Sequence, residues 1–169
     1  LDRTPFYAEM GGQIGDRGVV ETNERTLEIG DTIKDQSGRI LHRVIDLEGD
    51  ASPSPNSIES LTSKRVDARV DLETRREIER HHSATHLLHF ALRQVVGNQV
   101  RQAGSLVAAD RLRFDFTHFE AISPAQLAEI ESLINQRVLE NGRVETHEVT
   151  FSKKPDDVIA LFGENYGET

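Results

Sequence analysis

The sequence predicts an α+β protein, because the periodicity of its apolar residues changes once along the chain. The first 72 residues combine β-branched runs with glycine-rich turns, a pattern typical of a small β-barrel-like subdomain. From residue 73 onward, helical spacing alternates with short β-rich runs, which indicates a two-layer α/β subdomain. We therefore expect two subdomains, 1–72 and 73–169, and the 36% hydrophobic content suffices for a core.

The first subdomain begins with a cluster of four glycines between residues 11 and 18, which predicts tight turns. Residues 35–38, Asp-Gln-Ser-Gly, favour a turn between two β-rich runs, so we expect a hairpin there. Residues 49–57 contain two prolines and predict a loop. The expected strands are 19–22, 26–34, 39–47 and the alternating segment 66–72.

In the second subdomain, apolar residues at intervals of three and four from Ile78 to Val95 predict an amphipathic helix that ends at Gly97. Ser123 is a natural N-cap and Pro124 suits the first helical position, so a second helix follows. Its expected apolar face is Leu127, Ile130, Ile134 and Val138, and its expected end is Asn141 and Gly142. The remaining expectations are a hairpin of 102–107 with 112–116, a strand over 144–151 and a helix over 155–162.

Composition restricts the possible functions. The chain has no cysteine, which excludes disulfides and an all-thiolate zinc site built from this chain alone. A net charge of −9 disfavours a general nucleic-acid-binding surface, although a local patch is compatible with the arginines at 75, 76, 80, 93, 101, 111 and 113. No membrane span or signal peptide is evident, and there is no initiator methionine, so we expect a cytoplasmic piece of a longer protein.

Four of the seven histidines lie between residues 81 and 89. On a helix, His82 and His86 lie one turn apart on one face, where both can bind one metal ion, and His89 lies on the flank while His81 points elsewhere. Spacing alone leaves a metal site and ordinary surface histidines equally open. Zinc needs three or four protein ligands, and the other candidates are His42, His118 and His147. Ser83 follows His82 where metalloproteases have glutamate, which excludes that class.

Several motifs occur together with this histidine run. The first is the glycine-rich motif of residues 4–9, 11–13 and Asp16, and the second is the histidine run 82–89 with 91–93 and Gly97. The others are the hairpin segments 102–105 and 111–116 and the C-terminal segments 161–164 and 166–167. In this order they resemble the editing domain of alanyl-tRNA synthetases, from Thr4 to the last residue. Met10 is a departure, since the family usually has a small residue there.

The resemblance implies an esterase activity. The family's editing domain hydrolyses seryl- or glycyl-tRNA(Ala), so the tRNA acceptor end and the rest of an ATP-using alanine ligase are the expected partners. Its zinc is held by His-x-x-x-His, which maps onto His82 and His86, and by a downstream Cys-x-x-x-His that has no counterpart here. We therefore expect zinc to be partial or absent in this chain, and hydrolysis to be weak.

Further residues are assigned roles by the resemblance and by their position. Gln13 and Thr85 are candidate catalytic residues, Gln13 because its amide would orient substrate or water. Gly11 and Gly12 are either turn residues with positive φ or points of close approach to the tRNA end, and Arg80 is a candidate tRNA contact. The alternatives are a free-standing trans-editing deacylase, a function that some relatives perform, and a non-catalytic module that binds the acceptor end.

Overall fold

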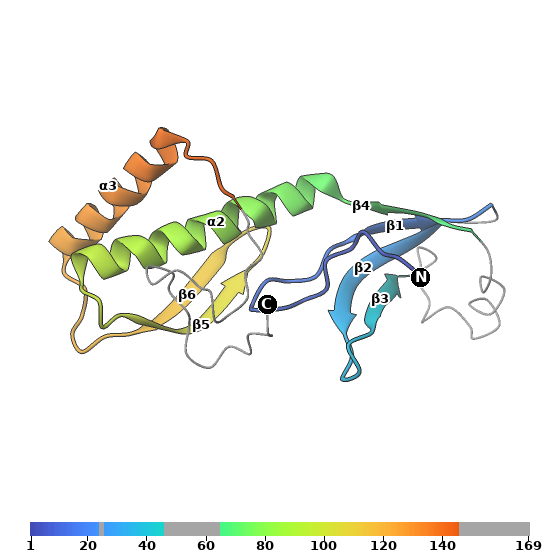
Figure 1. Ribbon diagram of the computed structural model, residues 1–169, viewed down its shortest axis with the longest axis horizontal. Coiled ribbons are helices and arrows are strands. Elements are labelled where there is room, and N and C mark those ends of the chain that lie inside the picture. Colours follow the sequence, from blue (N-terminus) through green and yellow to red (C-terminus); the bar gives the residue numbers. More distant parts are fainter. Residues whose placement is uncertain (24–25, 46–64, 146–169) are drawn as a thin grey trace.

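The computed structural model describes residues 1–23, 26–45 and 65–145. The predicted α+β class is confirmed: these residues form a four-stranded antiparallel sheet, a two-stranded sheet and two helices (Figure 1). Neither of these two helices is long and apolar enough to cross a membrane. The expected loop at 49–57, the expected helix at 155–162 and His147 lie outside the described residues. The expected strand at 144–151 lies mostly outside them, and its first two residues are in no strand.

The larger sheet has the strand order β3-β2-β1-β4. Its strands are β1 Gly18–Glu21, β2 Thr26–Lys34, β3 Ile40–Ile45 and β4 Asp67–Val70. Phe6, Val20 and Ile29 form the centre of its core. Within the described residues β3 and β4 remain at opposite edges, so the sheet is not closed and the barrel-like expectation is wrong in that respect.

The predicted hairpin between β2 and β3 is confirmed, and its turn is organised by Asp35. One carboxylate oxygen, Oδ1, accepts hydrogen bonds from the backbone amides of Ser37 and Arg39 at 2.8 and 2.9 Å. The hydrogen bond from the Ser37 hydroxyl, followed by those from the backbone and side chain of Arg39, lowers the pKa of Asp35 to about 2. Gly38 completes the turn with a φ of +82°, which a side chain would disfavour.

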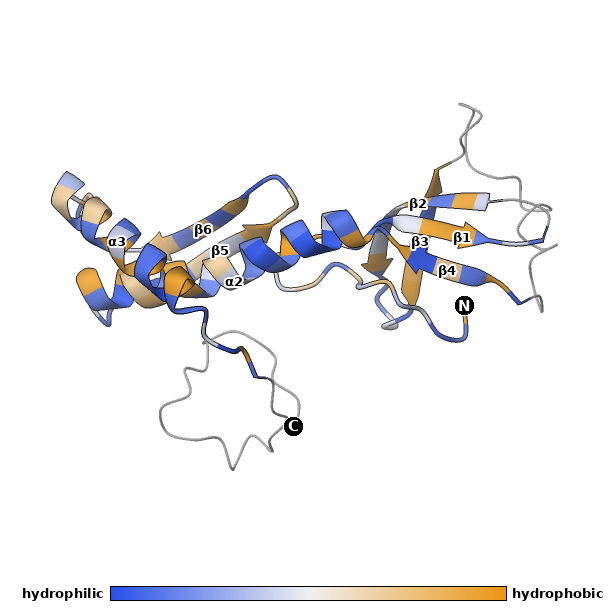
Figure 2. Ribbon diagram, turned by 90° about the horizontal axis from the view of Figure 1, so that it is seen from above, coloured by the Kyte–Doolittle hydropathy of each residue, from blue (hydrophilic) through white to orange (hydrophobic). Residues whose placement is uncertain are grey.

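Helix α2, Leu72–Val95, leads from the larger sheet to the smaller one. It begins earlier than the apolar spacing predicted, because the Asp71 carboxylate caps the amides of Glu73 and Thr74. The turns next to β4 are mostly hydrophilic, as Figure 2 shows, and the buried residues are Ile78, Thr85, Ala91 and Leu92. The helix therefore spans the distance between the sheets and packs mainly through its second half.

The second hairpin, β5 Arg101–Val107 and β6 Leu112–Thr117, is confirmed and lies beneath α2. Helix α3, Pro124–Glu140, has the predicted Ser123 cap and packs on α2 through Ile130. Helices on one side and strands on the other make the predicted two layers. The expected apolar face of α3 is only partly correct, because Leu127 and Val138 are 55% and 57% exposed. The packed face is formed instead by Ile130, Leu133 and Ile134.

Candidate functional site

The glycine-rich segment near the N-terminus lies against the end of β5. Met10 and Gln13 exchange backbone hydrogen bonds across a two-residue turn, in which Gly11 and Gly12 have φ values of +62° and +85°. The amide of Val107 donates to the carbonyl of Gly12 at 2.8 Å, and the amide of Ile14 donates to Val107 at 3.1 Å. The segment 10–14, which we call the glycine turn, is therefore joined to the sheet of the second subdomain.

Gly12 has a second reason to lack a side chain. A Cβ atom there would lie 2.4 Å from the carbonyl oxygen of Ser105, whereas one at Gly11 would meet no atom within 4 Å. The turn interpretation of both glycines is therefore confirmed. The close backbone approach at Gly12 is made to β5, and Gly11 is the glycine that lines the cavity described below.

Arg75 of α2 binds residues on both sides of the glycine turn in the sequence. Its guanidinium pairs with the carboxylate of Asp16, which is 2% exposed, and donates to the carbonyl of Pro5 at 2.7 Å. The hydrogen bond to Asp16 is the main reason that the pKa of Arg75 is raised. Arg75 was one of the arginines compatible with a local nucleic-acid-binding patch, but its guanidinium is paired with Asp16.

His82 and His86 lie side by side on α2, as their spacing predicted. Their ring centroids are 5.0 Å apart with an interplanar angle of 46°, and both side chains are exposed. Gln13 of the glycine turn reaches His82, with 2.7 Å between Oε1 and Nδ1. His81 points away from the pair and bonds the carbonyl of Ala108 through Nδ1 at 2.8 Å.

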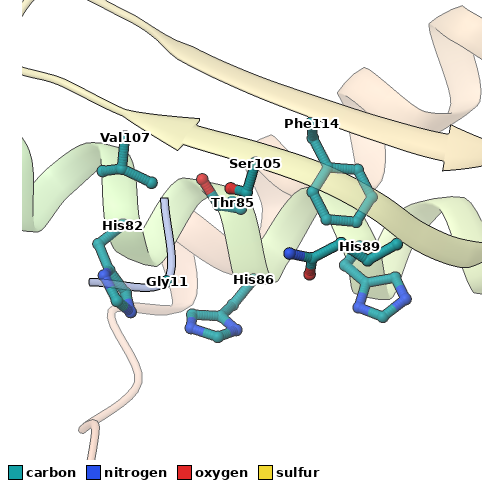
Figure 3. Close-up of a pocket in the computed structure, with 9 residues that line it drawn as sticks. Gly11, His82, Thr85, His86, His89, Ser105, Val107 and Phe114 are labelled. Carbon is teal, nitrogen blue, oxygen red and sulfur yellow. The ribbon is translucent and has the colours of Figure 1, made fainter. Parts of the chain in front are cut away.

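A cavity of about 140 Å³ opens between this face of α2 and the second hairpin (Figure 3). Thr85 is 8% exposed and donates its hydroxyl proton to the carbonyl of His81 at 2.8 Å. His89 stacks at a tilt on Phe114, with 5.2 Å between the ring centroids. The complete lining is Gly11, His82, Thr85, His86, His89, Gln102, Ser105, Val107 and Phe114.

The sequence motifs gave no role to two of these lining residues, Gln102 and Ser105. They stand three apart on β5, a spacing that would place them on opposite faces of a regular strand. The pairing of β5 with β6 shifts between Gln102 and Gly104, and this irregularity allows both residues to line one cavity. Strict alternation could not have predicted it.

The surroundings of His86 and His89 favour neutral imidazole, the form that binds metals. The side chain of His86 is exposed, but partial desolvation of its ring lowers its pKa, and the neighbouring His82 lowers it further. Burial, followed by the charge of Arg93, lowers the pKa of His89. In ligand type and spacing, His82 and His86 fit two positions of a tetrahedral zinc site.

The described part of the chain holds no group of three histidine, cysteine, aspartate or glutamate residues that could bind a metal. His42 lies in the larger sheet, where its Nε2 is 2.7 Å from the hydroxyl of Thr4, and His118 contacts Phe119. Neither histidine lines the cavity. Arg80, the candidate tRNA contact, is exposed beside Glu77 at 3.9 Å and does not line the cavity either.

Comparisons with known proteins agree with the motifs in pointing to alanine–tRNA ligases. Residues 1–65 match the family model described as tRNA synthetases class II (A). The chain is 48% identical over 168 residues to the alanine–tRNA ligase of Opitutus terrae, in a match that covers 99% of the chain and 18% of the relative. It is 45% identical over 171 residues to that of Pseudomonas entomophila, with coverages of 100% and 18%.

The chain is similar over its whole length to part of alanine–tRNA ligases. The enzyme of Methylacidiphilum infernorum gives the same result, with 46% identity over 170 residues that cover 99% of the chain and 17% of the relative. The chain thus spans less than a fifth of the length of the relatives it matches.

Proposed function

We propose that the chain is the editing part of an alanine–tRNA ligase and hydrolyses the ester of seryl- or glycyl-tRNA(Ala). The observation that carries the proposal is the meeting of the glycine turn and the histidine pair beside one cavity, through the 2.7 Å contact of Gln13 with His82. The names of the relatives support the ligase context. The proposed partners are the acceptor end of the tRNA and the rest of the ligase chain, and the proposed location is the cytoplasm.

Editing is needed because a pocket that binds alanine discriminates poorly against amino acids of nearly the same size. Glycine lacks one methyl group and serine adds one hydroxyl, and such a difference is worth roughly 1–3 kcal/mol, or about 10–200-fold. A second, hydrolytic site has to supply the remaining accuracy. That site must also spare correctly charged alanyl-tRNA.

The hydroxyl of Thr85 would make this second distinction. Its hydroxyl proton is directed to the carbonyl of His81, so the oxygen lone pairs can accept a further hydrogen bond. The hydroxyl of a seryl ester would donate to that oxygen, whereas the methyl group of an alanyl ester offers no donor. The buried hydroxyl would therefore favour seryl-tRNA over alanyl-tRNA.

His82 and His86 would hold a zinc ion, together with ligands outside the described residues. Zinc in such a site polarises a carbonyl or lowers the pKa of a bound water. The lowered pKa of His86 keeps its imidazole neutral and available as a ligand at neutral pH. The contact with Gln13 holds the His82 ring at the cavity.

Deacylation of seryl-tRNA and alanyl-tRNA by the full-length ligase tests the proposal. His82→Ala should slow seryl-tRNA hydrolysis by more than about 100-fold, since loss of even an outer partner of a metal site costs 10–100-fold. Thr85→Val should reduce the preference for seryl-tRNA over alanyl-tRNA. Ser83→Ala is the matched control, because Ser83 is exposed on the same helix and should leave both rates unchanged. A wild-type rate in His82→Ala would refute the assignment.

The same measurements distinguish the two alternative functions. Tight binding of an acceptor-stem RNA without hydrolysis by the full-length enzyme would show a non-catalytic module. Full hydrolysis by a natural protein that lacks the ligase core would show a trans-editing enzyme. For the 169-residue chain, we expect less than one zinc per chain by elemental analysis and weak hydrolysis, and one tightly bound zinc per chain would contradict this.

A further inference from the structure

We propose that Gln13 is a positioning residue that fixes the proton of His82 on Nδ1, and thereby leaves Nε2 as the nitrogen with the free lone pair. The sequence alone suggested that Gln13 orients substrate or water. The structure gives its amide oxygen a different partner, because Oε1 lies 2.7 Å from Nδ1 of His82. The residue would then act through the histidine.

The chemistry of the two groups determines the tautomer. An amide oxygen only accepts hydrogen bonds, so a bond between Oε1 and Nδ1 requires a proton on Nδ1. A neutral imidazole carries one ring proton, and Nε2 is then unprotonated. Histidine ligands of metals commonly donate their second ring N–H in this way, and the partner fixes both tautomer and ring orientation.

The backbone on both sides holds Gln13 in place for this role. Its amide and carbonyl both bond Met10 across the glycine turn, at 3.1 and 3.2 Å. The next residue, Ile14, donates to Val107, and Gly12 accepts from Val107. The turn is thus joined to β5, while His82 is carried by α2. The hydrogen bond therefore links two elements that the fold positions independently.

A role in direct substrate binding fits the geometry less well. Gln13 is absent from the residues that line the cavity, whereas Gln102, the other glutamine nearby, is among them. The side chain of Gln13 instead approaches His82 from the glycine turn. We therefore assign to Gln13 the orientation of a ligand and not contact with the ester.

The tautomer can be measured without any enzymatic activity, by ¹⁵N NMR of the histidine rings in the metal-free 169-residue chain, at a pH well above the histidine pKa. His82 should show a protonated Nδ1 in the wild type. Gln13→Met removes the acceptor at nearly constant shape, and should shift His82 toward the Nε2-protonated form that a free imidazole prefers. Gln13→Glu keeps an acceptor oxygen and should restore the Nδ1-protonated form.

Two controls belong to this experiment. His81 bonds the carbonyl of Ala108 through Nδ1, so its ring should stay protonated on Nδ1 in every variant and report that the fold is intact. Gln94→Met replaces an exposed glutamine on the same helix and should leave His82 unchanged. In the full-length ligase, Gln13→Met should also bind zinc about 10–100-fold more weakly than the wild type in a chelator competition.

The expected effect on zinc binding rests on the proposed function. The tautomer of His82 does not depend on that function. A shift of His82 in Gln13→Met without any esterase activity in the wild-type ligase would uphold the inference and refute the function. Loss of hydrolysis in Gln13→Met, with the tautomer and zinc affinity unchanged, would overturn the inference. It would show that Gln13 contacts the substrate directly. An Nε2-protonated His82 in the wild type would also overturn the inference.

Discussion

Gly12 is the residue at which local conformation and packing impose the same requirement. A side chain there would be strained by the φ of +85° and would also meet the carbonyl of Ser105. Gly38, in the hairpin of the larger sheet, has a similar φ of +82° but open space around it. A comparison of substitutions at Gly12 and Gly38 therefore distinguishes the cost of backbone strain from the cost of steric overlap.

We predict that Gly12→Ala lowers the free energy of unfolding more than Gly38→Ala does. Gly38→Ala should cost about 1–2 kcal/mol from the left-handed conformation. Gly12→Ala should cost about 2–5 kcal/mol, since an overpacking term of roughly 1–3 kcal/mol is added. Urea unfolding of both variants measures the difference, and equal losses would mean that the turn moves away from β5 without cost.

Among single residues, the sequence predicted the positions that depend only on spacing along the helix. The positions of His82 and His86 follow from helical periodicity, and both are where the spacing placed them. The partner of His82 was not predictable in the same way, because 69 residues separate it from Gln13. The pairing of Arg75 was not predictable for the same reason, since its partner Asp16 lies 59 residues away.

The first half of helix α2 buries one side chain, Ile78, so the start of the helix depends largely on the cap. The carboxylate of Asp71 accepts from the amides of Glu73 and Thr74 and from the Thr74 hydroxyl, at 3.1, 3.2 and 2.7 Å. The bonds from Thr74 are the main reason that the pKa of Asp71 is lowered. Apolar spacing could not locate this start, because residues 72–77 are mostly charged or polar.

We predict that Asp71→Ala lowers the free energy of unfolding by about 1 kcal/mol at neutral pH, as loss of an N-cap does. Because the pKa of Asp71 is lower in the folded state, its contribution is present above the unfolded pKa of 3.8 and is lost as pH falls through the folded value. Asp110→Ala, an exposed aspartate beside Arg111, should change stability by less than about 0.5 kcal/mol. Identical denaturation curves for the two variants would contradict the capping role.

For helix α3, the sequence predicted the start of the helix correctly but not all of its buried face. The capping box of Ser123 with Gln126 is local, and it forms as the sequence predicted. The choice of buried face depends on how α3 crosses α2, which periodicity does not specify. That crossing buries Ile130 and leaves Leu127 exposed.

In the molecule as a whole, the N-terminal segment joins the two sheets. It contacts β2 through the amide of Glu9, which donates to Thr32 at 2.8 Å, and it contacts β5 through Gly12. Asp16 anchors it to α2 through Arg75. The proposed boundary at residue 72 coincides with the first residue of α2, yet these contacts cross it. The division into 1–72 and 73–169 stays a prediction.

We predict that Arg75→Met destabilises the whole molecule. The change would leave the carboxylate of Asp16 buried without its guanidinium partner, which costs 3–5 kcal/mol in a fully buried pair. Since the Arg75 side chain is 28% exposed, we expect about 2–3 kcal/mol.

Chemical denaturation checks this value, with Arg76→Met as the control. Arg76 is the exposed neighbour on the same helix, and its replacement should cost less than about 0.5 kcal/mol. Equal stability of the two variants would show that water replaces Arg75 at Asp16 without cost.

The contact between Gln13 and His82 has a consequence for the order of events during translation. The glutamine leaves the ribosome 69 residues before the histidine that it bonds. At about 5–20 residues per second, the glycine turn waits roughly 3–14 s for its partner. The cavity therefore cannot form while the first sheet is the only part synthesised, and a nascent chain that stalls between them has no site at which to act on an ester.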